Sequence, residues 1–188
     1  MEIDFSKIFH QSSKDRYRGH PPVPDDPEEW PNEWKTTYFK AYPRLPKVEL
    51  PQSSDRTANF FDLIQTRASR QNFARGSITK AELAMLLQHS CGQTGTLENG
   101  RRRRAQPSGG AIFPIEIYPI VFRSGTDLKA GLYHYNVKEH KLDVLWDRKF
   151  SDADIDGLFA YPWVKDASVA FVMTAVSWRD QQKYGERG

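Results

Sequence analysis

The amino-acid sequence predicts an α+β domain in which helices pack on a mostly antiparallel sheet. Three observations support this fold class: a helix with clear end signals over residues 79–92, a hairpin pattern over residues 131–146, and a continuously apolar, β-branched run over residues 168–176. Helices, strands, a hairpin, another helix and a last strand follow one another in mixed order, which is typical of α+β proteins. The 188 residues are enough for one folding unit with a sizeable core.

Residues 1–57 are predicted to form an extended N-terminal arm, which precedes the domain of residues 58–188. This segment is rich in proline, tryptophan, tyrosine and charge, and it keeps neither helical nor strand periodicity for long. Its aromatic side chains are too many for a free tail, so we expect them to cover a protein surface, either that of the same chain or that of a partner. They are Trp30, Trp34, Tyr38, Phe39 and Tyr42.

Two helices are predicted at the start of the domain. The first is indicated by an apolar stripe at helical spacing, formed by Phe60, Phe61, Leu63 and Ile64. The second begins at a capping box of Thr79 and Glu82, beside a hydrophobic staple of Ile78 and Leu83. Its apolar face continues through Leu86 and Leu87 as far as Gly92.

Strands and one short helix are predicted for the rest of the domain. Residues 91–110 form a loop that leads into a strand over residues 112–122, in which Pro114 and Pro119 are expected at ends, edges or bulges. Ser151 and Asp154 begin the short helix. The apolar run of residues 168–176 is expected to be a central strand covered on both faces. The hairpin side chains are Leu132, Tyr133, Tyr135, Leu142, Val144, Leu145 and Trp146, and the buried side of the short helix is Ile155, Leu158 and Phe159.

Composition argues against several functional classes. The net charge is only +3, and the run Arg101–Arg104 is interpreted as solvated and not as a nucleic-acid site. No apolar run approaches the roughly 20 residues that cross a bilayer, and the N-terminus lacks the order of a secretion signal, so we expect a cytoplasmic protein without membrane segments. The histidines show no metal-ligand spacing, so we expect no metal. Cys91 is interpreted as a buried small hydrophobe in preference to a reactive thiol.

Three polar clusters are suited to an anionic, planar cofactor. Arg67, Ser69 and Gln71 can hold a phosphate and the edge of a heteroaromatic ring, although a basic helix end is an alternative explanation. The segment Pro107-Ser108-Gly109-Gly110 offers a hydroxyl and close backbone approach to a ligand, although a tight turn needs no ligand. Lys183 and Tyr184 place an amine beside a phenol, which suits proton exchange if the pKa of the lysine is lowered; an exposed pair is the alternative.

The ordered segments RASRQNF, ITKAELAMLLQHSCGQTG, RRRRAQPSGGAIFPIEIYPIVF and GLYHYNVKEHKLDVLW resemble the nitroreductase-like family, specifically its SagB-type dehydrogenases. The opening FSKIFHQSSKDRYRG is similar to the N-terminal extension of that branch. The resemblance implies a homodimer that binds FMN at its interface, with NAD(P)H as a candidate second cofactor. It implies that Arg67 and Ser69 contact the flavin phosphate and ribityl chain, and that residues 107–110 lie against the isoalloxazine ring.

The resemblance also implies roles for Lys183 and Tyr184, which match a pair proposed to remove a proton from azoline rings. Where the family often has a second basic residue at the flavin edge, this sequence has Gln71, which can hydrogen-bond the ring but supplies no positive charge. In the family, KYGERG leads into a further helix and glycine-rich flavin contacts, so these 188 residues are expected to correspond to its N-terminal part.

Three functions are therefore consistent with the sequence. The first is an FMN-dependent dehydrogenase that oxidises azoline rings in modified peptides. The second is an NAD(P)H-dependent reductase of nitroaromatics or quinones, in which Lys183 and Tyr184 are dispensable. The third is a flavin-free module that binds partner proteins through its aromatic arm, a reading that Gln71 favours.

Overall fold

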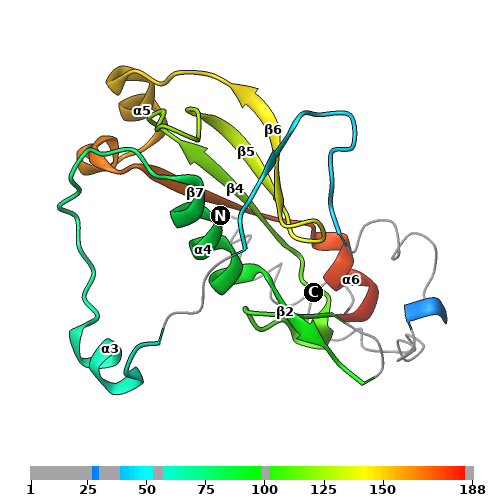
Figure 1. Cartoon of the computed structure of the whole chain (residues 1–188). Helices are drawn as coiled ribbons and strands as arrows, with labels where there is room; N and C mark the ends of the chain where they lie inside the picture. Colours follow the sequence, from blue (N-terminus) through cyan, green and yellow to red (C-terminus); the bar gives the residue numbers. More distant parts are fainter. Residues whose placement is uncertain (1–26, 30–38, 53–56, 99–101, 185–188) are drawn as a thin grey trace, which may run out of the picture.

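The computed structural model describes residues 27–29, 39–52, 57–98 and 102–184, and among them a five-stranded antiparallel sheet forms the centre of the molecule (Figure 1). The strand order is β1-β6-β5-β4-β7. The strands are β1 (Lys47–Glu49), β4 (Ile115–Val121), β5 (Gly131–Asn136), β6 (Lys141–Asp147) and β7 (Val169–Ala175). Helices lie against this sheet, so the predicted α+β class is confirmed.

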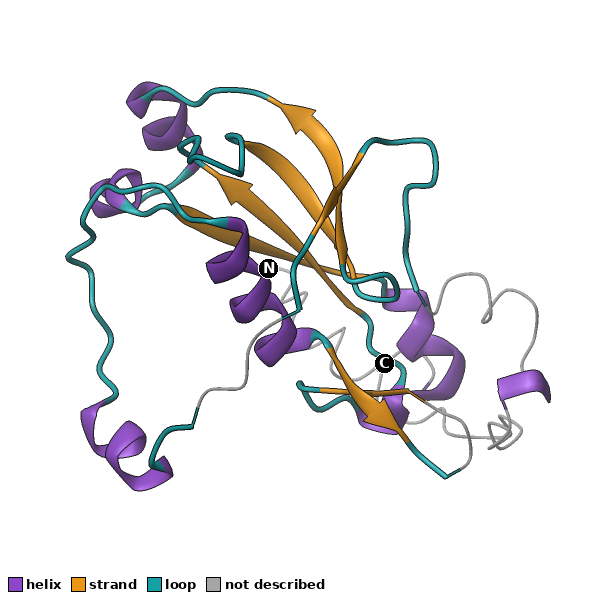
Figure 2. Ribbon diagram, viewed as in Figure 1, coloured by secondary structure: helices purple, strands orange, loops and turns teal. Residues whose placement is uncertain are grey.

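Helix α4 (Lys80–Cys91) covers one face of the sheet (Figure 2). The predicted capping box is present, because the Thr79 side chain accepts from the backbone N–H of Glu82 while the Glu82 carboxylate accepts from that of Thr79. The helix ends at Gly92, as the sequence indicates. Its apolar side chains form the main core with residues of the neighbouring strands: Leu83, Ala84 and Leu87 from α4, and Val121, Tyr133, Tyr135 and Leu142 from the sheet.

A second, smaller core lies on the other face of the sheet. Phe122 follows β4 and packs there against α5 (Asp152–Leu158) and the 3-10 helix η3 (Pro162–Asp166). The capping box of Ser151 and Asp154 is confirmed, and Ile155 is buried. The prediction that Leu158 belongs to the buried side is wrong: its side chain is exposed. It is the last residue of a helix of only two turns, and it does not reach the sheet.

Among the described residues strand β7 lies at the edge of the sheet, so the prediction of a central strand covered on both faces is wrong for this part of the chain. It pairs with β4 along its whole length, from Val169 opposite Val121 to Ala175 opposite Ile115. Within the described chain no strand pairs with its other edge. The apolar, β-branched composition indicates the strand itself but does not determine how many neighbours it has.

The hairpin of β5 and β6 is confirmed, with a bulge between Leu132 and Tyr133. Pro119 lies inside β4, a central strand, and not at its end. Pairing between β4 and β5 is limited to Ile120 and Val121, so the missing N–H of Pro119 coincides with the point where that ladder stops.

The remaining elements lie outside the five-stranded sheet. Strands β2 (Gln93–Thr96) and β3 (Arg102–Arg104) form a separate two-stranded ribbon. The 3-10 helices η1 (Pro27–Glu29) and η2 (Gly109–Ala111) are single turns. Helix α3 (Phe60–Thr66) lies apart from the sheet (Figure 1), with Phe60, Phe61, Leu63 and Ile64 all exposed. The helix itself is confirmed, and its apolar face has no core to pack against within the described chain.

Part of the predicted N-terminal arm is described. Phe39 packs against the main core, Tyr42 lies against the sheet, and β1 pairs with β6. Trp30, Trp34 and Tyr38 lie outside the described residues. The boundary near residue 57 stays a prediction.

Candidate functional site

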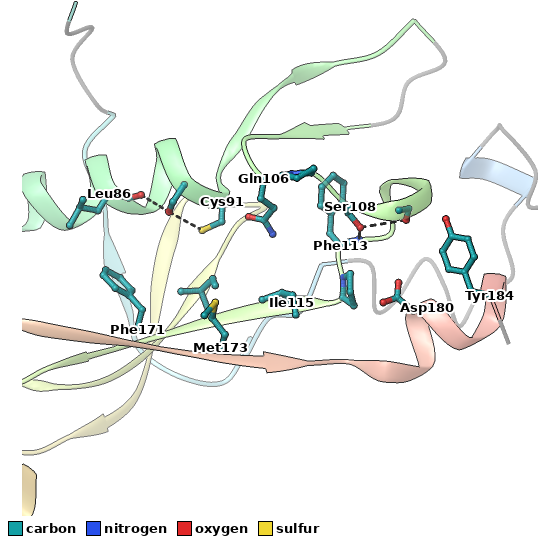
Figure 3. Close-up of a pocket in the computed structure, with 15 residues that line it drawn as sticks. Leu86, Cys91, Gln106, Ser108, Phe113, Ile115, Phe171, Met173, Asp180 and Tyr184 are labelled. Carbon is teal, nitrogen blue, oxygen red and sulfur yellow. Dashed lines mark hydrogen bonds between the residues drawn. The ribbon is translucent and has the colours of Figure 1, made fainter. Parts of the chain in front are cut away.

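A pocket of about 740 Å³ opens between the end of α4, the strands β4 and β7, the loop before β4, and α6 (Ser177–Tyr184) (Figure 3). Much of its wall is apolar. Leu86 comes from α4, Ile115 and Ile117 from β4, and Phe171 and Met173 from β7. A volume of this size is typical of pockets that hold cofactors or drug-sized ligands.

Polar groups enter the pocket from two sides. Pro107, Ser108 and Gly109 line one side, and Asp180 and Tyr184 line the other (Figure 3). The two sides approach closely, because a Cβ at Gly109 would lie 3.2 Å from the Tyr184 hydroxyl oxygen. Glycine at this position therefore permits the loop to pass beside the tyrosine.

The loop that carries Ser108 has a defined shape. The Ser108 hydroxyl accepts a hydrogen bond of 2.9 Å from the backbone N–H of Phe113, which closes the turn that contains η2. Gly110 has a φ of 60°, in the left-handed region that glycine adopts without strain. The glycine pair thus serves the turn, and Gly109 also serves the contact with Tyr184.

Helix α6 is held in place by Arg179, whose side chain is only 4% exposed. Its Nη1 donates to the carbonyl oxygen of Phe113 at 2.8 Å and lies 2.6 Å from Glu116 Oε1. Both partners belong to β4 or to the turn before it. The position of α6 is therefore linked to the first strand residues of β4.

Arg179 is one end of a buried chain of charges. Each ring nitrogen of His134 faces a carboxylate: Nε2 lies 2.9 Å from Glu116 Oε2, and Nδ1 lies 3.0 Å from Asp143 Oδ2. Asp143 Oδ1 then pairs with Lys47 Nζ at 2.5 Å. Carboxylates only accept hydrogen bonds, so a ring nitrogen of His134 that carries a proton can donate to the carboxylate it faces. We call these five residues the buried charge chain.

Aromatic rings cover His134 on the same face of the sheet. The rings of Tyr42 and Tyr118 lie 5.1 Å from the imidazole, and their hydroxyl oxygens are 3.2 Å apart. Lys40 Nζ donates to the Tyr118 hydroxyl at 2.7 Å. The N-terminal segment therefore closes this region from solvent.

Both carboxyl groups of the buried charge chain have lowered pKa values. Burial by itself would raise the pKa of Glu116, but the hydrogen bond from His134 and the charge of Arg179 outweigh it. Burial opposes ionisation of Asp143 in the same way, and Lys47, His134 and the backbone N–H of Tyr42 together bring its pKa below the ordinary value. Both groups are thus held as carboxylates in the folded protein.

These shifts predict a loss of stability in acid. A carboxyl whose pKa is lowered by folding stabilises the fold fully above its unfolded pKa, here the ordinary 4.5 for Glu116 and 3.8 for Asp143, and less as pH falls through the lower folded value. We expect the free energy of unfolding, measured in urea at stepwise lower pH, to fall below about pH 4.5. Glu116→Gln should show a shallower fall, and an identical pH profile in both proteins would contradict the assignment.

The structure brings some of the predicted site residues together and leaves others apart. Pro107, Ser108, Gly109 and Tyr184 meet at the pocket, and Gly110 lies in the adjoining turn. Lys183 belongs to α6, but its side chain lies outside the described residues. Cys91 lines the pocket, is buried as predicted, and has a pKa raised by burial.

Arg67, Ser69 and Gln71 are exposed, and none of them lines the pocket of the same chain. Arg67 follows the last residue of α3, and the two others lie in the segment that leads from α3 to α4 (Figure 1). Their role in cofactor binding therefore stays a prediction.

Sequence reasoning missed Asp180 and the buried charge chain. A signal for Asp180 was present, since it precedes Tyr184 by four residues and a helix brings such residues to one face. Glu116, His134 and Asp143 lie on three different strands, β4, β5 and β6, and no local pattern in the sequence indicates that their side chains point to the same face. Only the strand order of the sheet brings them into contact.

Comparison with known proteins identifies relatives by sequence. The chain is 32% identical over 116 residues to the trifolitoxin-processing protein TfxB of Rhizobium leguminosarum bv. trifolii, covering 58% of this chain and 31% of that protein. It is 25% identical over 142 residues to a protein of Methanocaldococcus jannaschii described as a candidate nitroreductase, covering 76% of this chain and 68% of that protein. No protein-family model matches the sequence.

Solved structures share the fold. A crystal structure of a candidate nitroreductase from Anabaena variabilis superposes with a TM-score of 0.62 at 23% identity, covering 97% of this chain and 34% of that one. A second, from Ralstonia eutropha, has a TM-score of 0.52 at 23% identity, covering 73% of this chain and 59% of that one. The chain spans about a third of the length of TfxB and of the Anabaena protein. No helix of the described residues is long and apolar enough to cross a membrane. The chain thus has the nitroreductase-like fold, with relatives by sequence that include TfxB and a candidate nitroreductase.

Proposed function

We propose that this chain forms the substrate-side wall of an FMN-dependent oxidoreductase of the SagB type, which dehydrogenates azoline rings in a modified peptide. One observation carries the proposal: a single pocket joins the loop of Pro107, Ser108 and Gly109 to Tyr184. These are two of the three clusters that the sequence resemblance connects with flavin and with proton transfer. The similarity to a trifolitoxin-processing protein supports a processed peptide as substrate.

The residues of the pocket fit an isoalloxazine ring. Its flat faces are largely apolar and suit a wall of Ile115, Ile117 and Met173, while its polar edge suits the loop at Ser108 and Gly109. Bound there, a flavin would supply a two-electron acceptor. The chain would orient the ring through the loop, exclude water through the apolar wall, and offer Tyr184 and Lys183 for the proton.

The phosphate end of FMN needs cationic contacts from elsewhere. Among the described residues that line the pocket there is no lysine or arginine, so neither Arg67 nor any other described cation of the same chain is part of its wall. The exposed apolar face of α3, which precedes Arg67, has the composition of a surface that packs against protein. We therefore propose a homodimer in which α3 and Arg67 of one subunit reach the pocket of the other.

A second candidate function is reduction of nitroaromatics or quinones with NAD(P)H. It is favoured by the description of the Methanocaldococcus jannaschii relative as a candidate nitroreductase. The third, a flavin-free binding module, requires that the pocket does not take up flavin. Anaerobic mixing of the flavin-loaded protein with either NADPH or a thiazoline peptide separates the first two functions. The thiazoline peptide should bleach the flavin of a dehydrogenase, whereas NADPH should bleach the flavin of a nitroaromatic or quinone reductase.

Flavin binding is tested by replacing Gly109. Gly109→Val places side-chain atoms against Tyr184 and narrows the pocket, so we expect the dissociation constant for FMN to rise by about tenfold or more, equal to about 1.4 kcal/mol. Quenching of flavin fluorescence measures it. Gly157→Ala is the matched control, because a Cβ at Gly157 meets nothing within 4 Å. Absence of quenching by the wild-type chain would favour the flavin-free module, and equal affinity in both variants would place the flavin elsewhere.

A further inference from the structure

Two consecutive residues of helix α6, Arg179 and Asp180, contact opposite faces of the sheet. Arg179 pairs with Glu116, whereas Ile115 and Ile117, the neighbours of Glu116 in β4, line the pocket. Side chains alternate between faces along a strand, so Glu116 points away from the pocket. Arg179 therefore pairs with Glu116 on the face of the sheet opposite the pocket. Asp180 lies about 100° further around the helix and faces the pocket.

Asp180 and Tyr184 act from the same side of α6. They are four residues apart, which places them one above the other on a helix, and both line the pocket (Figure 3). Asp180 is the only charged side chain among the described residues that line this pocket. A carboxylate and a phenol thus stand side by side opposite the loop of Ser108 and Gly109.

The surroundings of Asp180 make its carboxylate a stronger base than an exposed one. Burial raises the pKa of Asp180, and the positive charge of Arg179 lowers it by less. Arg179 is paired with Glu116 at 2.6 Å. The negative charge of Glu116 therefore offsets much of the effect of Arg179 on the pKa of Asp180. Proton transfer by a positioned carboxylate is most effective when its pKa moves towards the working pH.

We infer that Asp180 is a further catalytic residue of this pocket, which accepts the proton released from the ring carbon of the substrate. The inference rests on the proposed function. In dehydrogenation of a thiazoline, the C–H bond at the ring α-carbon breaks and its proton passes to the Asp180 carboxylate. The electron pair left behind would form the new C=C bond, and a bound oxidised flavin would supply the two-electron acceptor for the hydride of the neighbouring carbon. Asp180 then releases its proton to solvent, and Tyr184 hydrogen-bonds the ring.

The test follows the proton step without flavin turnover. A short peptide with one thiazoline ring is incubated in D₂O with the flavin-free protein, and mass spectrometry measures exchange of the ring proton for deuterium. We expect wild-type protein to accelerate exchange and Asp180→Asn to reduce the accelerated rate by about 100-fold, the lower end of general-base contributions. Asp180→Glu, which keeps the carboxylate, should restore part of the rate. Asp156→Asn is the control, since Asp156 lies on α5 and pairs with Lys165 at 3.6 Å.

A second readout does not depend on any substrate. Carbon-13 NMR of labelled aspartate, with Asp180 assigned through Asp180→Asn, should show Asp180 titrating above the ordinary aspartate pKa of 3.8, and titration at or below that value would contradict the raised basicity. Circular dichroism establishes that each variant is folded, and if Asp180→Asn fails to fold, Asp180→Glu and Asp180→Ser carry the comparison.

FMN titration of the same variants keeps the two proposals distinct. Equal flavin affinity in wild type and Asp180→Asn, together with lost exchange, supports Asp180 as the base. Flavin binding with unchanged exchange in Asp180→Asn, or no acceleration by wild type, overturns the inference and leaves the flavin proposal standing. Exchange that depends on Asp180 without any flavin binding would reject the oxidoreductase while retaining Asp180 as the base.

Discussion

Replacing Glu116 by glutamine is expected to lower the free energy of unfolding by about 3–5 kcal/mol, the cost of removing one partner from a buried ion pair. Glu116 is 3% exposed, and its two carboxylate oxygens face Arg179 at 2.6 Å and His134 at 2.9 Å. Glutamine has nearly the same shape but no charge, so it leaves the buried Arg179 guanidinium without its counter-charge and offers His134 only a neutral acceptor. Desolvation of the guanidinium is then no longer offset by attraction.

Urea unfolding followed by circular dichroism measures this effect. Glu49→Gln is the matched control, because Glu49 is exposed and its pair with Lys141 Nζ at 3.0 Å is solvated. Exposed ion pairs contribute little to stability, so the free energy of unfolding of the control should be close to that of the wild type. A similar small change in both variants would show that the buried charge chain does not hold the fold together.

The same substitution should also affect the pocket. Arg179 is held by Glu116 and by the Phe113 carbonyl oxygen, and with Glu116→Gln only the second contact keeps its full strength. We expect α6 to be held less firmly, which displaces Asp180 and Tyr184 from the loop of residues 107–110. Weaker FMN affinity in a variant that is still folded at 25 °C would connect the charge chain with the pocket.

Leu87→Ala is the second substitution with a large expected effect, a loss of about 2–5 kcal/mol in the free energy of unfolding. Leu87 is 1% exposed and packs in the main core between α4 and the sheet. Truncation removes three carbon atoms from a close-packed interior, so the lost burial is added to the cost of a cavity.

The neighbouring Leu86 provides the control for this prediction. It is 45% exposed and lines the pocket, so Leu86→Ala creates no enclosed cavity. We expect Leu86→Ala to change stability much less than Leu87→Ala and to weaken FMN binding more. Urea unfolding and flavin quenching of both variants test this, and equal destabilisation would mean that α4 packs differently from the described arrangement.

Local signals were sufficient to predict most of the elements. The capping boxes at Thr79 and Ser151 depend on residues three positions apart, and the hairpin after Gly131 depends on alternation within a short window. Such patterns act through neighbours in the sequence, so they are visible without the fold. The loop of residues 107–110 was also visible, because its glycines and serine are consecutive.

The predictions failed where the answer depends on which segments are neighbours in space. The apolar run of β7 indicates a strand, but its position at the edge of the sheet is decided by pairing with β4 alone. Leu158 follows the helical period of α5, yet only the packing of α5 on the sheet decides that Ile155 is buried and Leu158 is not.

By itself, the sequence determined the α+β class and the helix ends, since these follow from patterns of residues close together in the chain. The loop of residues 107–110 and Tyr184 were candidates through the family resemblance, and their roles stay predictions. The tertiary structure alone decided that Lys47, Asp143, His134, Glu116 and Arg179, spread over 133 positions from first to last, form one buried charge chain. It also decided that Asp180 faces the pocket while Arg179 faces away. The physical reason is that a buried charge needs a partner, and here each partner lies on another strand or on α6, whose positions are set by packing of the whole sheet.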